Sequence, residues 1–234
     1  MSAPATKGIA LVTGASRGIG RATALRLVRD GYHILAAARH AGELVLLAEE
    51  VRALGGSCEP LVLDVTDVAA VAAALSGREV DVLVNNAGVG VMKPFVELSA
   101  AEWDRMMDVN VNALFHVTRA VLPGMLARER GHVVIIGSIA GRSAFTGGTA
   151  YAGTKHFVMG FAECLMLEVR DQGVKVTVVS PGSVGTDFSA SSRKDWALEA
   201  EDVAESVSWV VETPPGVLLH RVEVRALSPK RPRR

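Results

Sequence analysis

The chain alternates between short apolar runs and longer stretches in which apolar residues recur every three or four positions. The short runs are typical of buried strands, and the longer period is typical of helices with one apolar face. Strands are predicted at 8–13, 33–38, 58–64, 80–85, 132–138, 175–180 and 222–224. Helices are predicted at 21–30, 42–54, 68–75, 100–130, 152–172 and 201–212.

Local signals mark the ends of these helices. Ser99 and Glu102 fit a capping box at the start of the fourth helix, in which each side chain accepts from the other residue's backbone N–H. A glycine follows five of the helices, where a left-handed residue commonly ends a helix. These glycines are Gly31, Gly55, Gly77, Gly131 and Gly173.

Strands that alternate with helices predict parallel strands joined by right-handed crossovers. The expected fold is α/β, a doubly wound parallel seven-stranded sheet in a single domain. We expect an N-terminal extension at 1–7, the domain at 8–228 and a basic flexible tail at 229–234. Ligands of such sheets bind at the carboxyl ends of the strands.

Composition narrows the range of functions. Hydrophobic residues make up 49% of the chain and the formal net charge is zero, so we expect neither a nucleic-acid nor a membrane partner. The two cysteines cannot form a disulfide framework, and the six histidines show no metal-ligand spacing. We therefore expect no metal site. The N-terminus has no apolar signal core, so a cytoplasmic enzyme is expected.

A glycine-rich turn follows the first predicted strand. Gly14, Gly18 and Gly20 stand in the pattern Gly-x-x-x-Gly-x-Gly, directly before a helical stretch. Such a strand, turn and helix place a phosphate at a helix N-terminus. By itself the pattern is also compatible with an ordinary loop.

Tyr151 and Lys155 are four residues apart, so on a helix their side chains share a face. Ser138 ends a predicted strand and could face them. A nearby ammonium favours phenolate and lowers the pKa of a phenol, as an acid/base group requires. In isolation, the spacing would be compatible with an exposed helix face.

Taken together, the motifs resemble those of the short-chain dehydrogenase/reductase family, in its short single-domain branch, from about residue 7 to about residue 187. They are Thr-Gly-Ala-Ser-Arg-Gly-Ile-Gly at 13–20, Leu-Asp-Val at 63–65, Asn-Asn-Ala-Gly at 85–88, Asn110, Ser138, Tyr151, Lys155 and Pro181-Gly182. The resemblance implies a Rossmann fold and an enzyme that interconverts a carbonyl and a secondary alcohol by hydride transfer.

The resemblance also assigns roles at the reaction centre. Tyr151 would be the acid/base, Ser138 would stabilise the substrate oxygen, and Lys155 would bind the nicotinamide ribose and lower the pKa of Tyr151. Asn110 would hold a water that links Lys155 to solvent, and it could also bend its helix. These four residues are the expected catalytic residues.

The resemblance implies a nicotinamide cofactor, with its pyrophosphate on the turn at 14–20 and its adenine amino group donating to Asp64. Asp64 could instead be a helix-capping acid beside Asp67. The implied cofactor-binding residues are Thr13, Gly14, Ser16, Arg17, Gly18, Ile19, Gly20, Arg39, Asp64, Val65, Asn86, Ala87, Gly88, Tyr151, Lys155, Pro181, Gly182, Val184 and Thr186.

Two arginines predict the choice of cofactor. An NAD-specific site carries a carboxylate at the end of the second strand, which grips the ribose 2′-hydroxyl. Here that place is Ala38, and Arg39 follows it. In the resembling family Arg17 faces the same pocket. Two guanidiniums would bind a 2′-phosphate through charge-assisted hydrogen bonds, so NADP(H) is expected.

The substrate is less well defined by the sequence. We expect Met92, Phe145, Phe188 and Trp196 to line the substrate pocket, with Arg142 and Arg193 as candidates for an anionic group. The end of the chain resembles hydroxy-acid and broad carbonyl reductases. A 3-oxoacyl-carrier-protein reductase and a non-catalytic dinucleotide-sensing or scaffold protein remain as alternatives; the short stretch after Thr186 argues against a sugar-nucleotide epimerase.

Two helices predict self-association, because they carry apolar residues on more than one face. They lie at 109–130 and 152–172 and include Leu114, Phe115, Val121, Leu122, Phe157, Phe161, Leu165 and Leu167. A homodimer or homotetramer is expected, and in the resembling family the same two helices form the interface.

Overall fold

The computed structural model describes residues 6–186, 188 and 195–227. Within them, parallel strands form one seven-stranded sheet in the order β3-β2-β1-β4-β5-β6-β7. The strands are β1 (Gly8–Thr13), β2 (Tyr32–Ala38), β3 (Cys58–Val62), β4 (Val82–Asn85), β5 (Gly131–Ile136), β6 (Val174–Pro181) and β7 (Arg221–Val224). The predicted fold class is therefore confirmed. The predicted tail at 229–234, the domain end at 228 and residues 1–5 of the extension lie outside the described residues.

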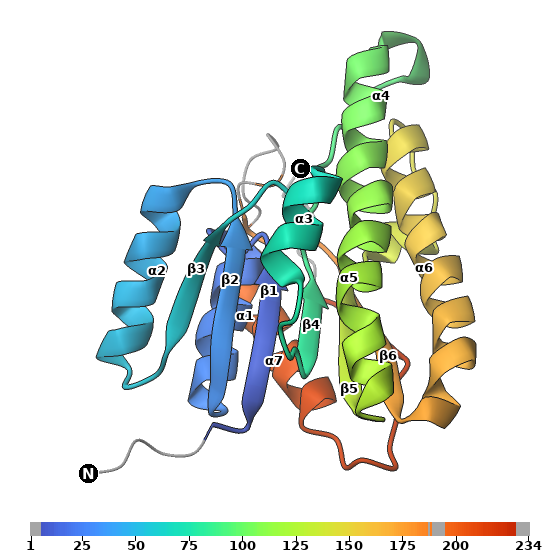
Figure 1. The fold of residues 1–234 in the computed structure, drawn as a ribbon. Helices are drawn as coiled ribbons and strands as arrows, with labels where there is room; N and C mark the ends of the chain where they lie inside the picture. The colour runs from blue at the N-terminus through green and yellow to red at the C-terminus, as the bar shows by residue number, and fades with distance from the viewer. Residues whose placement is uncertain (1–5, 187, 189–194, 228–234) are drawn as a thin grey trace.

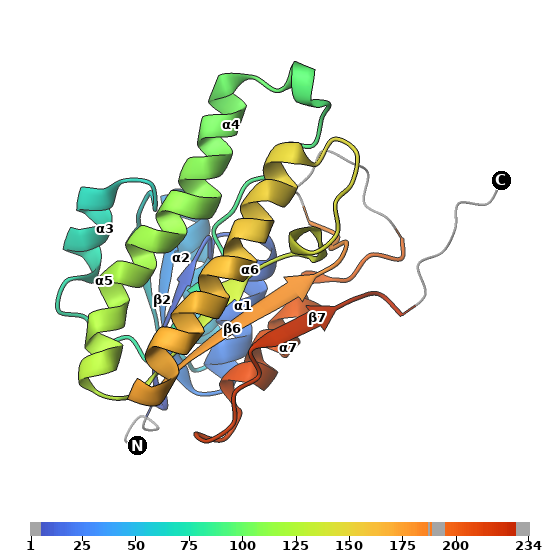
Figure 2. The same cartoon turned by 90° about the vertical axis from the view of Figure 1, so that its right-hand side faces the viewer.

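Helices cover both faces of the sheet, as Figures 1 and 2 show. Those that pack on the sheet are α1 (Gly18–Arg29), α2 (Ala41–Ala53), α3 (Val68–Leu75), α5 (Ala113–Ala127), α6 (Thr149–Val169) and α7 (Ala200–Val211). Successive β1 side chains point to opposite faces: Leu11 packs in the core beneath α3, α5 and α6, whereas Ala10 and Val12 pack beneath α1, α2 and α7. Burial of both faces explains why the strands read as continuous apolar runs.

The strand order reverses between β1 and β4. A crevice forms at such a switch point, because the connections after the two strands diverge to opposite faces of the sheet. The loops that follow β1 and β4 carry the glycine-rich turn and the segment Asn86 to Gly88. The topology therefore brings two of the predicted cofactor motifs to one place.

The predicted helix at 100–130 is interrupted. It comprises α4 (Ala100–Met107), a π-helical turn at Asp108–Asn112 and α5. The predicted capping box at Ser99 and Glu102 is present at the start of α4. Periodicity alone cannot distinguish this arrangement from one long helix, because a π-helical turn adds a residue without ending the helix.

One helix-end prediction is wrong. Gly31, Gly55, Gly77 and Gly173 adopt positive φ, as expected, but Gly131 begins β5 and does not. Glu129 takes the left-handed conformation in its place, with φ of 49°. Gly131 is needed for another reason: a Cβ there would lie 2.5 Å from Cγ of Met125, which is fully buried.

Candidate active site

A cleft of about 1450 Å³ runs along the carboxyl ends of the strands. It is lined by the loops after β1, β2, β3 and β4, and by the ends of β5 and β6. The predicted site residues that line it are Gly14, Ser16, Arg17, Gly18, Ile19, Arg39, Asp64, Val65, Asn86, Ala87, Gly88, Ser138, Tyr151, Lys155, Pro181, Gly182, Val184 and Thr186. The structure thus brings together most of the residues that the sequence singled out.

The glycine turn forms the floor of this cleft. Gly14 and Gly18 adopt φ of 66° and 53°, a conformation that side chains rarely tolerate. Helix α1 begins at Gly18, three residues earlier than predicted, and Arg17 makes no side-chain cap. Gly18 and Ile19 of the first turn line the cleft, and no N-cap side chain occupies the N–H groups of this turn, which suits a bound phosphate.

Thr13 and Gly20 do not line the cleft but hold its floor in place. The Thr13 hydroxyl accepts from the backbone N–H groups of Asn86 and Ala87, both at 3.1 Å. The Asn86 amide donates to the carbonyls of Thr13 and Gly14 at 2.8 and 3.2 Å. A Cβ on Gly20 would lie 2.2 Å from the Gly14 carbonyl oxygen, so this position allows α1 to pack closely.

Arg39 and Asp64 lie at the β2 and β3 end of the cleft, and Arg17 lines the same cleft. Arg17 and Arg39 are both exposed there, and Arg39 Nη1 is 4.0 Å from the Asp64 carboxylate. Asp64 Oδ1 accepts from the Thr66 backbone N–H and hydroxyl. These bonds, with a smaller contribution from Arg39, hold the pKa of Asp64 below its usual range. Asp67, not Asp64, caps α3.

Ser138 and Tyr151 meet at the reaction centre. Ser138 follows β5, and its hydroxyl accepts from the Ala140 backbone N–H at 3.1 Å. The phenol of Tyr151, in the first turn of α6, lies close enough to Ser138 for this neighbour to lower the pKa of the phenol. Both side chains are buried. A substrate oxygen that reached this pair would meet two hydroxyl groups, as the predicted roles require.

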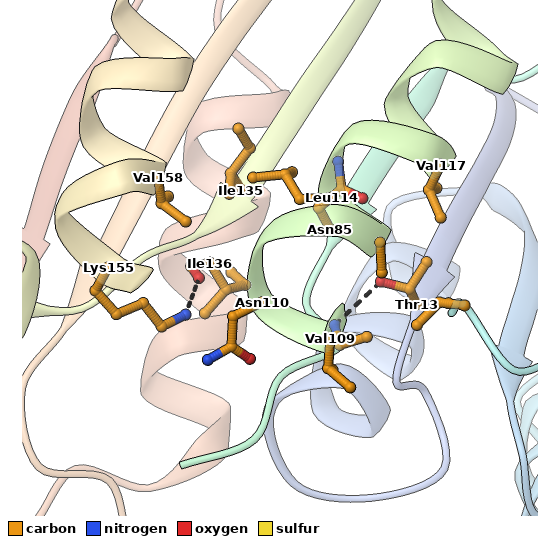
Figure 3. A pocket seen from close by; sticks show the side chains of 13 residues that line it. Thr13, Asn85, Val109, Asn110, Leu114, Val117, Ile135, Ile136, Lys155 and Val158 are labelled. Atoms are coloured by element: carbon orange, nitrogen blue, oxygen red, sulfur yellow. Dashed lines mark hydrogen bonds between the residues drawn. The ribbon is translucent and has the colours of Figure 1, made fainter. Parts of the chain in front are cut away.

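Lys155 lies one helical turn beyond Tyr151 and donates to the Ile136 carbonyl at 2.9 Å (Figure 3). Burial lowers the pKa of Lys155 to about 8. Burial also raises the pKa of Tyr151, and the neighbouring Ser138 hydroxyl opposes this increase. The prediction that Lys155 lowers the pKa of Tyr151 is therefore not seen in this geometry, where Lys155 Nζ lies 5.9 Å from the ring centroid.

Asn110 lies in the π-helical turn and lines a smaller cavity of about 20 Å³ beside Lys155 (Figure 3). Its amide oxygen accepts from the Val89 backbone N–H at 2.9 Å. Its amide nitrogen donates to the Val89 carbonyl at 2.8 Å and to the Thr154 hydroxyl at 3.1 Å. The cavity has room for about one water molecule. The π-helical turn makes the helix irregular at this residue, and both the helix bend and the water-holding role stay predictions.

The walls near Tyr151 are mainly apolar. Met92, Phe145 and Phe188 line the cleft as expected, and the Phe188 ring centroid lies 5.7 Å from that of Tyr151. A Cβ on Gly90 would lie 2.6 Å from Phe188, so glycine leaves room for this ring. Trp196 and Arg142 do not line the cleft, and Arg142 is 4.0 Å from Glu223. Arg193 lies outside the described residues.

The segment after β6 closes the far side of the cleft. Gly182 donates to the Val224 carbonyl at 2.8 Å, which ties this segment to β7. Val184 forms an isolated bridge with Leu198, and the Thr186 N–H donates to the Val184 carbonyl at 2.9 Å. The backbone of Pro181 to Thr186 is therefore fixed at two points.

Sequence reasoning missed several residues of the site. His40, Thr66, Ser143 and Ser183 also line the cleft. The Ile136 carbonyl holds Lys155 and could not have been found, because a backbone acceptor leaves no signal in residue type. Thr154 could have been found, because it is a polar residue on the buried side of α6.

Residues 6–186, 188 and 195–227 contain no cluster of three or more His, Cys, Asp or Glu side chains that could hold a metal ion. No helix among them is long and apolar enough to cross a membrane.

Comparisons with known proteins agree with this geometry. The family model for short chain dehydrogenases matches residues 8–197. The chain is 38% identical over 235 residues to the NADP-dependent 3-hydroxy acid dehydrogenase YdfG of Salmonella typhi, an alignment that covers 92% of this chain and 94% of that protein.

Solved structures extend the comparison. The closed form of a serine dehydrogenase complexed with NADP⁺ is 36% identical, with a TM-score of 0.87, and 92% of this chain and 94% of that one align. A metagenomic short-chain oxidoreductase in complex with NADP is 34% identical, with a TM-score of 0.86 and coverages of 95% and 98%. The chain belongs to the short-chain dehydrogenase family.

Proposed function

We propose that the protein is an NADP(H)-dependent oxidoreductase that interconverts a carbonyl and a secondary alcohol, with Tyr151 as acid/base. The observation that carries the proposal is the convergence of Ser138, Tyr151 and Lys155 in one cleft with the glycine turn. Related proteins that are named as NADP-dependent, or that were solved with NADP, support the cofactor. A non-catalytic sensor would have no need of the buried Tyr151–Ser138 pair.

The residues of the cleft fit a dinucleotide. The left-handed glycines at 14 and 18 let backbone N–H groups approach a pyrophosphate. Arg17 and Arg39 would hold the 2′-phosphate, and the segment at 181–186 would pack beside the nicotinamide. When bound, NADPH supplies the hydride.

The side chains of the protein then handle the proton. Ser138 donates a hydrogen bond to the substrate oxygen and stabilises the negative charge that develops there. Tyr151 gives its proton to that oxygen in reduction and takes it back in oxidation. With the cofactor bound, the buried Lys155 ammonium would favour the phenolate that remains, an effect that the geometry without cofactor does not show; the Ile136 carbonyl holds Lys155 in the cleft. The apolar walls of Met92, Phe145 and Phe188 keep water from the reaction centre.

The substrate class is proposed from the relatives. A 3-hydroxy acid dehydrogenase and a serine dehydrogenase both act on small molecules with a hydroxyl near a carboxylate. We therefore propose small 3-hydroxy acids, or their 3-oxo forms, as the first substrates to test.

The experiment follows NADPH consumption by the purified protein with a panel of small 3-oxo acids, their esters, simple ketones and an acyl thioester. Turnover of at least one small carbonyl compound is expected. Tight NADPH binding without any turnover across the panel would instead support the sensor alternative. Turnover confined to the acyl thioester would support the carrier-protein reductase alternative.

We also propose that the protein is a homodimer or homotetramer formed through α5 and α6, which lie side by side on one face (Figure 2). Leu114, Val121 and Leu165 of the predicted set are buried in the core. Phe115, Phe157 and Leu167 remain 43%, 42% and 54% exposed. A second subunit would cover these three large apolar side chains, and their exposure in the single chain supports self-association.

A further inference from the structure

Thr154 links the first turn of α6 to Asn110, two parts of the site that none of the predicted residue roles connects. It precedes Lys155 in α6, and its side chain is only 2% exposed. Its hydroxyl donates to the Tyr151 carbonyl at 2.8 Å and accepts from the Asn110 amide nitrogen at 3.1 Å. A threonine that bonds back to its own helix is common, but the second bond reaches a different element.

The second bond extends to the wall of the cleft. Asn110 also donates to and accepts from the backbone of Val89, at 2.8 and 2.9 Å. Val89 lies in the loop after β4 and lines the cleft. A continuous hydrogen-bonded chain therefore runs from Val89 through Asn110 and Thr154 to the backbone of Tyr151.

The position of Tyr151 explains why such a chain matters. Tyr151 is the third residue of α6, and the N-cap residue Gly148 provides no side-chain cap. Helix ends fray, because their first N–H groups lack intrahelical partners. The phenol that must meet Ser138 is therefore carried by an end of the helix that no N-cap side chain secures.

We propose that Thr154 is a positioning residue for Tyr151, which couples the first turn of α6 to Asn110 and to the cleft wall at Val89. The proposal rests on the proposed role of Tyr151 as acid/base. Thr154 does not touch the reacting atoms; it fixes the direction from which the phenol approaches them.

The test replaces the hydroxyl with a methyl group of similar size, in Thr154→Val. The chain offers a matched control in Thr118→Val. Thr118 is also 2% exposed, and its hydroxyl accepts from the amide of Asn85 at 3.0 Å, a bond to β4 and not to α6. Both variants lose one buried hydrogen bond to an asparagine. The full-length protein is used throughout, with kcat, KM and the NADPH Kd measured for each variant.

A misplacement of about 1 Å costs on the order of a hundredfold in rate, so kcat of Thr154→Val should fall at least about tenfold. Its NADPH Kd and the kcat of Thr118→Val should stay within about twofold of wild type, since a twofold change is below 0.5 kcal/mol. Thr154→Ser, which keeps the hydroxyl, should recover most of the lost rate. If Thr154→Val does not fold, Thr154→Ala removes the hydroxyl with less crowding. The same fall in kcat and the same unchanged NADPH Kd are then expected of Thr154→Ala.

Equal kcat values for Thr154→Val and Thr118→Val would overturn the inference. So would a loss of kcat and of NADPH binding together, because that pattern indicates a general structural role. Tyr151→Phe is measured alongside. If that variant keeps its turnover, the proposed function itself fails; if it is inactive while Thr154→Val is normal, only this inference fails.

Discussion

The Lys155 ammonium donates a hydrogen bond to the Ile136 carbonyl, 2.9 Å away. Ile136 is the last residue of β5, and Ser138 follows two positions later. One strand end therefore carries the serine hydroxyl and also fixes the lysine. Because both groups are anchored to the same strand, the position of α6 relative to β5 sets the whole Ser138, Tyr151 and Lys155 arrangement.

This burial predicts a pH dependence. A lysine is a cation below its pKa and neutral above it, and burial lowers the pKa of Lys155 to about 8. The pKa of Tyr151 is raised, so the phenol stays protonated over the range in which Lys155 loses its charge. We expect kcat/KM for NADPH in the reduction direction to fall as pH rises through about 8.

The profile is measured from about pH 6 to about pH 10, because kcat/KM reports groups of the free enzyme. Thermal melts over the same range serve as the control for unfolding. A profile that stays flat until the phenol itself titrates would show that the charge of Lys155 is not required.

Tyr151→Phe tests the proton donor directly. The variant loses only the phenolic oxygen, so NADPH affinity should be retained while kcat falls by about 10²- to 10⁴-fold, the usual value of a positioned acid. Lys155→Ala should reduce both NADPH affinity and kcat, because the ammonium is expected to bind the nicotinamide ribose and to favour the phenolate of Tyr151.

Tyr32→Phe is the matched control for Tyr151→Phe, since Tyr32 is the other tyrosine of the chain and begins β2, at the opposite end of the sheet. Burial, with a smaller contribution from Glu212, raises the pKa of Tyr32 to about 12. Stopped-flow NADPH oxidation at high enzyme concentration measures the residual rates. A Tyr151→Phe rate close to that of Tyr32→Phe would exclude Tyr151 as the acid.

The fold and most of the cleft could be predicted because each depends on local patterns. Strands buried on both faces read as apolar runs, and parallel order then places Gly14, Asn86 and Ser138 at one edge of the sheet. Residue types with special backbone freedom also leave a clear signal, as Gly14 and Gly18 show with their positive φ.

What could not be predicted depends on tertiary contacts. Thr13 and Gly20 belong to the glycine motif, yet they brace the turn and do not line the cleft, which only the packing of Asn86 against them reveals. The burial that raises the pKa of Tyr151 could not be predicted either, because the spacing from Lys155 gives proximity but not burial. Trp196 has the apolar character of a pocket residue but does not line the cleft, although its neighbour Ala197 does.

Self-association is tested at the exposed face of α5 and α6. Phe157 stacks on Phe161, with ring centroids 5.8 Å apart, and is 42% exposed. A carboxylate in a buried interface is costly when it is unpaired, so Phe157→Glu should shift a dimer or tetramer toward a smaller species.

Leu46→Glu provides the control for Phe157→Glu, because Leu46 is 63% exposed on α2, on the other face of the sheet. It should leave the mass unchanged. Light scattering at micromolar concentration gives the mass of each species. A monomeric mass for the wild-type protein under these conditions would contradict the proposed self-association.

We expect the exposed end of the cleft to determine the choice of cofactor. Arg39 faces Asp64 at 4.0 Å, and Arg17 lines the same cleft. An exposed ion pair at this distance contributes little, so Arg39 is available for a 2′-phosphate, which offers it a stronger charge-assisted bond. We expect NADPH to be preferred over NADH at least about tenfold in kcat/KM, which corresponds to about 1.4 kcal/mol.

Arg39→Ala should weaken NADPH binding and leave NADH nearly unchanged, because only the phosphate loses a partner. Arg52→Ala, at the exposed end of α2, changes the net charge by the same amount and should affect neither cofactor. Binding of both cofactors is measured by fluorescence titration at two salt concentrations, since a charge-assisted contact weakens as salt rises. Equal wild-type efficiency with NADPH and NADH would refute the assignment. An equal loss for both cofactors in Arg39→Ala would show instead that Arg39 supports the adenosine half of the site.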